Sequence, residues 1–312
     1  MAIVTFCLTV ACGRSEVHRS TSSDCRLIQH ALGETCVPLH PKRIVPTGSG
    51  IFENLLALGI EPIATVSTFV DSPHLQARIK EFPNIGLDGE PSIEKILAMK
   101  PDLILGDIYN ENIYHQLSQI APTVLLPFTH SGDWKTFFAL TGDAVGKPET
   151  AQQVIDDYYK RLDTFKQQMG DHLSQTEVSI IYVYPDTITV YTTAGFNGTI
   201  LQDAGLARPP AQNLDATATQ QRDSSSPIQY RISKEVLHEA DGDVIFVIST
   251  HGTPGVTERL DRLKADPLWA KLKAVQQGRV YEVPDYWIGS GPIAANALID
   301  DLFKYLLEQP QS

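Results

Sequence analysis

The chain has 312 residues, of which 42% are hydrophobic and 20% are charged, and its formal net charge is −12. This composition is that of a folded globular protein and excludes a largely disordered chain. The acidic balance gives no electrostatic basis for binding nucleic acid, so we expect no nucleic-acid partner. The length predicts two lobes, each with its own core.

An apolar stretch, residues 1–11, opens the chain and ends at Cys12. It is shorter than the about 18 residues of a membrane-spanning helix and is typical of the hydrophobic part of a signal peptide. Leu8-Thr9-Val10-Ala11 before the cysteine is similar to the lipobox of bacterial lipoproteins, and a Ser-rich tether follows. We expect lipidation of Cys12 to hold the protein at a membrane by this anchor alone. An uncleaved secretory peptide and a start further upstream are the alternatives.

Two cysteines, Cys25 and Cys36, bracket a predicted hairpin with Gly33-Glu34 in or near its turn. Thiols on opposite arms of a hairpin can form a disulfide in an oxidising compartment. Two buried free thiols are the alternative. The spacing does not fit a zinc site, because no second Cys/His pair follows.

From Pro41 the chain alternates short apolar strands with amphipathic helices. The predicted strands are 43–46, 62–66, 103–105 and 123–126, and the predicted helices are 51–58, 93–99 and 113–120. This alternation favours a largely parallel sheet covered by helices.

Residues 148–169 have the periodicity of one long helix. Apolar residues recur there at steps of three and four: Ala151, Val154, Ile155, Tyr158, Leu162, Phe165 and Met169. A helix of this length spans roughly 30 Å, at about 1.5 Å per residue. Its position near the middle of the chain suits a connector between two lobes.

The strand–helix pattern then restarts. We expect strands at 178–183, 188–191, 244–248 and 279–283, helices at 198–204, 234–239, 267–273 and 294–307, and a long polar loop at 217–230. The predicted fold class is therefore α/β, with two Rossmann-like lobes joined by one long α-helix. The divisions are an anchor, tether and hairpin at 1–40, a first lobe at 41–147, the helix at 148–171 and a second lobe at 172–312. A helical connector predicts a cleft that closes only slightly.

Several segments together resemble the helical-backbone periplasmic binding proteins of ABC importers, which carry iron–siderophores, haem or vitamin B12. The segments are 41–45, 53–59, 92–104, 120–124, 232–237, 241–245, 266–269, 278–281 and Trp287, so the likeness runs from about 41 to 307. The resemblance implies a monomeric, periplasmic binding protein that is not an enzyme and has no cofactor. It would deliver a ferric siderophore to a permease dimer with its ATPase.

The resemblance also implies docking residues. In the family, one exposed glutamate on each lobe pairs with arginines of the permease, and the matching positions here are Glu94 and Glu235. Each lies in the first turn of a predicted helix, after Ser92 and Ser233, where the helix dipole favours a carboxylate. Arginine can bind such a carboxylate bidentately. Simple stabilisation of the helix is the alternative.

The ligand is expected beyond the carboxyl ends of the strands, where loops of the two lobes face each other. Seven residues of these loops are candidate contacts: Ser49, Phe69, Tyr109, Tyr191, Arg222, Tyr286 and Trp287. Aromatic rings offer rigid apolar walls, and a guanidinium binds oxygen-rich anions. Catecholate binders of the family use clustered arginines, whereas only Arg222 lies in a favourable loop. This favours a hydroxamate or citrate–hydroxamate chelate.

Other functions stay open as alternatives. The same fold binds cobalamin or haem. Related proteins bind bare zinc or manganese through histidine and carboxylates, and His130 and His251 follow predicted strands. A metal-dependent reductase or lyase is a further alternative, although the sequence has no complete phosphate-binding loop, no G-x-S-x-G and no HExxH.

Overall fold

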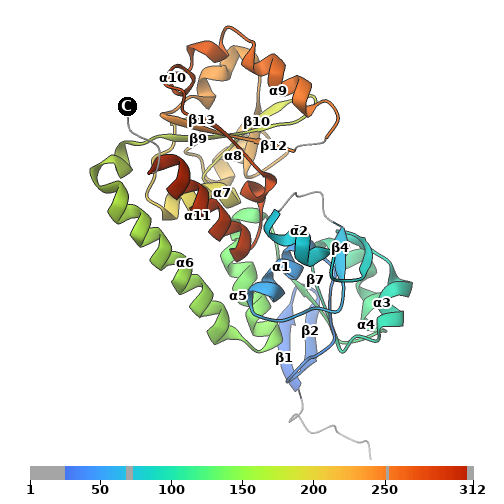
Figure 1. Cartoon of the computed structure of the whole chain (residues 1–312). Coiled ribbons are helices and arrows are strands. Elements are labelled where there is room, and N and C mark those ends of the chain that lie inside the picture. The colour runs from blue at the N-terminus through green and yellow to red at the C-terminus, as the bar shows by residue number, and fades with distance from the viewer. Residues whose placement is uncertain (1–24, 68–72, 251–252, 308–312) are drawn as a thin grey trace, which may run out of the picture.

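The computed structural model describes residues 25–67, 73–250 and 253–307, so Cys12, Phe69 and His251 lie outside the described residues. Two lobes are joined by the long helix α6 (Pro148–Met169), which runs along one side of the molecule (Figure 1). Each lobe has its own sheets and helices. The predicted fold class, α/β with two lobes and one connecting helix, is confirmed.

The first lobe is built around a parallel sheet in the order β3-β7-β8. Its strands are β3 (Ile44–Pro46), β7 (Leu103–Asp107) and β8 (Thr123–Leu126). A smaller sheet contains β4 (Thr65–Ser67), β5 (Asn84–Leu87) and β6 (Glu90–Pro91). The helical segments are α1 (Ser49–Ala57), α2 (Pro73–Ile79), α3 (Ile93–Met99), η1 (Ile108–Ile113), α4 (Tyr114–Ser118), η2 (Ser131–Asp133) and α5 (Trp134–Val145).

A hairpin of β1 (Cys25–His30) and β2 (Gly33–Pro38) precedes this lobe. The structure joins Cys25 and Cys36 by a disulfide across the two arms, with their Cα atoms 5.5 Å apart. The hairpin is attached to β8, because the Ala31 N–H donates to the Leu125 carbonyl at 2.9 Å. It therefore covers the edge of the first lobe's sheet.

Helix α6 is unbroken over the predicted range and starts with Pro148, which suits the first turn of a helix. Its apolar stripe is buried at Ala151, Tyr158, Leu162, Phe165 and Met169. The helix continues as η3 (Gly170–Gln175). The Tyr158 hydroxyl donates to Asp203 of the second lobe at 2.7 Å, and Trp134 of the first lobe packs on the same ring. The middle of α6 thus contacts both lobes.

The second lobe has one five-stranded sheet in the order β11-β10-β9-β12-β13. Its strands are β9 (Val178–Val183), β10 (Ile188–Tyr191), β11 (Gln229–Ile232), β12 (Val244–Ser249) and β13 (Val280–Val283). The strands β9, β12 and β13 are parallel. The helical segments are α7 (Phe196–Asp203), α8 (Ala216–Arg222), η4 (Lys234–Ala240), α9 (Val256–Lys264), η5 (Trp269–Lys271), α10 (Lys273–Gln276), η6 (Asp285–Ile288) and α11 (Pro292–Leu306). Apolar clusters fill both faces of the sheet.

The predicted polar loop at 217–230 is wrong. The structure has α8 there, then a turn and strand β11. The helix is capped by Asp215, whose carboxylate accepts the Ala218 N–H at 2.8 Å, and it is fixed to the lobe by the buried Thr219. A capping aspartate and one buried threonine are sufficient for a short helix that has no apolar stripe.

The last helix, α11, lies between the lobes and packs against both α6 and α1 (Figure 1). Its first turn lacks a side-chain cap of its own. Glu53 of α1 supplies one, because its carboxylate accepts the Ala294 N–H at 2.8 Å. The lobes also touch where a Cβ on Gly132 would lie 2.0 Å from the Ala194 carbonyl oxygen. Among the described helices, none combines the length and the apolarity needed to cross a membrane.

Candidate functional site

A cavity of about 290 Å³ lies at the carboxyl ends of the first lobe's strands. Ser49 follows β3, Asp107 ends β7 and Phe128 follows β8, so three parallel strands bring their ends to one place. The remaining lining residues are Gly50, Asp88, Gly89, Tyr109, Phe137 and, from the second lobe, Ser290. Small-molecule sites in α/β proteins lie at this edge of the sheet, and this volume is near the lower end of their range.

Two carboxylates form one wall of this cavity. Asp88 accepts hydrogen bonds from the backbone N–H of Ser49, at 3.2 Å, and from its hydroxyl. Asp107 accepts the Tyr109 N–H at 3.0 Å. A Cβ on Gly48 would lie 3.1 Å from an Asp107 oxygen and 3.5 Å from an Asp88 oxygen, so both carboxylates converge on that glycine. Burial, with the nearby charge of Asp88, raises the pKa of Asp107 to about 6.

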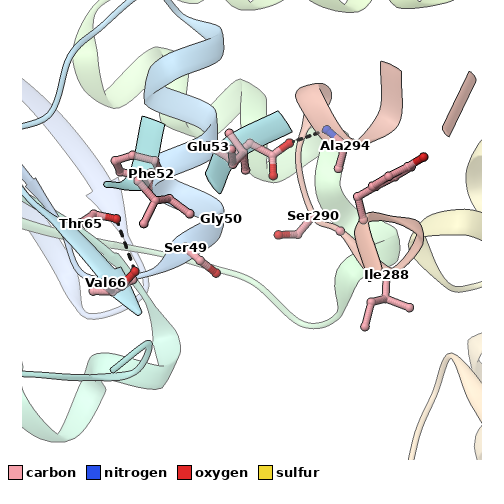
Figure 2. Close-up of a pocket in the computed structure, with 13 residues that line it drawn as sticks. Ser49, Gly50, Phe52, Glu53, Thr65, Val66, Ile288, Ser290 and Ala294 are labelled. Carbon is pink, nitrogen blue, oxygen red and sulfur yellow. Dashed lines mark hydrogen bonds between the residues drawn. The ribbon is translucent and has the colours of Figure 1, made fainter. Parts of the chain in front are cut away.

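A second, smaller cavity of about 50 Å³ continues between the lobes and shares Ser49, Gly50 and Ser290 with the first. Figure 2 shows Glu53 reaching across it toward Ala294. Glu53 is only 5% exposed, and burial raises its pKa to about 7, while N–H groups of the first turn of α11 act against this shift. The Glu53 carboxyl group therefore lies buried at the contact between the two lobes, where it joins α1 to α11.

Three of the seven candidate contacts line these cavities. Ser49 lines both, Tyr109 lines the larger one and Tyr286 lines the smaller one. Tyr109 is 62% exposed and packs edge-on against Phe128, with ring centroids 6.5 Å apart. An exposed ring at the mouth of a cavity is available to a ligand. Phe69 lies outside the described residues.

The structure places Tyr191 and Trp287 in the core of the second lobe, away from both cavities. Trp287 stacks near Phe246 and donates its indole N–H to Asp301 at 2.8 Å. Burial raises the pKa of Tyr191 far above its usual range. Both rings therefore pack in the hydrophobic core of the second lobe.

Arg222 ends α8 and forms an ion pair with Glu239. Its guanidinium lies 4.0 Å from the centre of the Tyr230 ring. It lines neither of the two cavities described above. The Arg222 guanidinium, which the sequence analysis proposed as a ligand contact, is thus bound by the Glu239 carboxylate and the face of the Tyr230 ring.

Asp88, Asp107, Phe128 and Ser290 line the larger cavity, and sequence reasoning did not select them. A signal was present for Asp107, which lies two residues after the predicted strand at 103–105. The seven candidate contacts were aromatic residues, one arginine and one serine, and included no acid. Asp88 lies in the two-residue turn between β5 and β6, and Ser290 lies in the connection from η6 to α11, so neither belongs to a periodic apolar pattern.

The two candidate docking glutamates have matching surroundings on separate lobes. Glu94 lies in the first turn of α3 and accepts the Ser92 hydroxyl at 2.9 Å. Glu235 lies in the first turn of η4, and both carboxylates are exposed to solvent. The pKa of Glu94 is lowered by its own backbone N–H and by Ser92, and that of Glu235 by Ser233 and its own N–H. Both side chains are therefore charged at neutral pH.

His130 and His251 are the candidate metal-ligating histidines. His130 caps η2, accepting the Gly132 N–H at 3.2 Å, and lies 3.9 Å from Asp133. Within the ranges that the structure describes, no group of three or more His, Cys, Asp or Glu side chains is arranged to bind a metal ion. His251 is outside those ranges.

Comparisons with known proteins agree with this architecture. The model of the periplasmic binding protein family matches residues 44–287. The Bacillus subtilis protein named "Probable siderophore-binding lipoprotein YfiY" is 36% identical, over 96% of this chain and 94% of its own length. The crystal structure of Staphylococcus aureus SirA complexed with staphyloferrin B is 26% identical, covers 90% of this chain and 98% of its own, and has a TM-score of 0.76. The chain belongs to the periplasmic binding protein family.

Proposed function

We propose that this protein is the extracytoplasmic substrate-binding component of an ABC importer and that it captures a ferric siderophore. The observation that carries the proposal is the cavity between the lobes, where the ends of three parallel strands meet Ser290 of the second lobe. The relatives support the cargo, since their names describe binding of siderophores and, for the Bacillus subtilis protein YxeB at 25% identity, of iron(3+)-hydroxamate.

The mechanism is capture without chemistry. A chelate of this class would contact Tyr109 and Phe128 with its apolar surface and hydrogen-bond to Ser49 and Ser290. The connector α6 and the interlobe cap on α11 oppose a wide hinge motion. The loaded protein would then differ only slightly in shape from the empty one.

The test is calorimetric titration of the purified chain with ferric hydroxamates, a ferric citrate–hydroxamate, ferric citrate, ferric catecholates, haem and cobalamin. A ligand that binds only the folded state must also raise the unfolding temperature, which gives an independent readout. Saturable binding of at least one ferric siderophore is expected. Binding of haem or cobalamin alone would move the function to another cargo of the same fold, and no binding to any member would end the proposal.

Docking to the membrane permease is assigned to Glu94 and Glu235. Both are exposed, charged and present once per lobe, as two symmetric arginine sites would need. Lipidation of Cys12 would keep the protein next to that permease. Mass spectrometry of the mature N-terminus tests the anchor, and an unmodified Cys12 would rule it out.

A bare zinc or manganese cargo has a separate test. Metal analysis of dialysed protein should find no stoichiometric zinc or manganese if the cargo is a chelate. One equivalent of tightly held metal would favour the bare-ion function.

A further inference from the structure

The side chains of the two interlobe cavities that can carry charge near neutral pH are all carboxyl groups. Glu53 lines the smaller cavity, and Asp88 and Asp107 line the larger one. Among the residues described as lining them, none is lysine, arginine or histidine. An anionic chelate placed here would meet carboxylates at short range in a partly dry space, which is unfavourable.

Three arginines of the second lobe are held by partners outside these cavities. Arg222 pairs with Glu239, and Arg231 binds both oxygens of Asp223. Arg208 is buried against the Tyr191 carbonyl and Gln212, away from both cavities. None of these guanidinium groups lines the cavities, so none of them neutralises the negative charge of the two aspartates there.

Hydrogen bonds hold the carboxylates of Asp88 and Asp107 at the wall of the cavity. Asp88 is held by both donors of Ser49, and Asp107 by the Tyr109 N–H, so neither depends on a basic partner among the bonds described. Between them lies Gly48, which leaves the space where a side chain would separate them. Exposed Tyr109 stands beside this acidic wall and can pack on a methylene chain or stack on a cation.

We propose that Asp88 and Asp107 are specificity-determining residues that select chelates bearing a cationic group, in particular a protonated primary amine on a ferric hydroxamate. This inference rests on the proposed function and narrows its substrate class. Citrate-containing and catecholate chelates, which carry net negative charge, are disfavoured by the same wall. Selection acts through charge close to the ligand and therefore weakens as salt is raised.

The experiment compares two ligands that differ only at one end: a linear ferric trihydroxamate with a free primary amine, and the same chelate with that amine acetylated. Titration calorimetry at low salt should show at least tenfold tighter binding of the free amine. Equal binding, or tighter binding of a ferric citrate or catecholate chelate, overturns the proposal while leaving the importer function intact. Failure of every ferric chelate to bind is the separate result that refutes the proposed function.

Variants then assign the effect to residues. Asp88→Asn and Asp107→Asn should each reduce the difference between the two ligands, mainly by weakening the free amine, because the amide keeps the shape and removes the charge. Asp163→Asn, on the exposed side of α6, is the matched control and should keep the full preference. A preference that survives in both cavity variants overturns the assignment to these aspartates.

Discussion

Replacing Glu53 by glutamine should make the protein less sensitive to pH. Glu53 accepts the Ala294 N–H across the lobe junction and is nearly inaccessible to solvent. Its pKa is about 7 in the folded protein, against 4.5 when unperturbed. Glutamine keeps the acceptor oxygen and the shape but cannot ionise.

The direction in which pH changes the free energy of unfolding follows from proton binding by Glu53. Between pH 4.5 and 7 the folded state holds the Glu53 proton more tightly than the unfolded state, so this group's contribution to the free energy of unfolding is present below pH 4.5. It is lost as pH rises through 7. At about 1.4 kcal/mol per pKa unit, the whole loss is about 3 kcal/mol, most of which falls between about pH 5 and 8.

The assay is urea unfolding of the wild type and Glu53→Gln at several pH values. The difference in unfolding free energy should shift in favour of glutamine by about 2 to 3 kcal/mol from about pH 5 to 8, because all other groups cancel. Glu94→Gln is the matched control: it makes the same chemical change at an exposed helix start and should show no such trend. A Glu53→Gln difference that is constant with pH would refute a buried, proton-holding carboxyl at the lobe junction.

Three further predictions concern docking, lobe contact and the hairpin. Glu94→Ala with Glu235→Ala should abolish ferric chelate uptake by cells and leave the calorimetric dissociation constant unchanged. Gly132→Ala should lower the unfolding temperature, because the added Cβ would meet a carbonyl oxygen of the other lobe at 2.0 Å. Serine at both Cys25 and Cys36, which lie 11 positions apart, should lower the free energy of unfolding in urea by about 2 to 3 kcal/mol through the freed loop entropy.

Each of these has a control or a result that would contradict it. Glu149→Ala removes another carboxylate from the first turn of a helix, α6, and should leave uptake normal. If it also abolishes uptake, loss of helix stabilisation explains the double variant. An unfolding temperature unchanged by Gly132→Ala would mean that the lobes separate there freely. Reducing agent should destabilise the wild type and have no effect on the double serine variant.

Regular elements were the most predictable part of the fold. The bounds of α6 were correct because seven apolar residues repeat over six turns, a pattern that no strand or loop shares. Helix α8 was missed because its stability depends on a capping aspartate and on packing of Thr219, neither of which leaves a periodic trace.

The candidate site was only partly predictable, since side-chain partners are set by tertiary contacts. Arg222 reads as an available cation next to Asp223, yet its partner is Glu239, 17 positions away in the sequence. Trp287 reads as a cleft residue, whereas its neighbour Tyr286 lines the cavity and Trp287 packs inward against Phe246. Both residues lie in η6 and both donate to Asp301, and the sequence does not say which of the two rings also lines the cavity.

The cap that α1 provides to α11 has a consequence for protein engineering. Residues 172–312 do not carry everything that their last helix requires, because the acceptor for its first turn belongs to a residue more than two hundred positions earlier. In a chimera that joins this second lobe to the first lobe of a relative, the first turn of α11 loses the acceptor for its Ala294 N–H. The exception is a relative whose first lobe has a hydrogen-bond acceptor at the position of Glu53. The smallest unit that can be exchanged between such proteins is therefore a lobe together with the opposing helix.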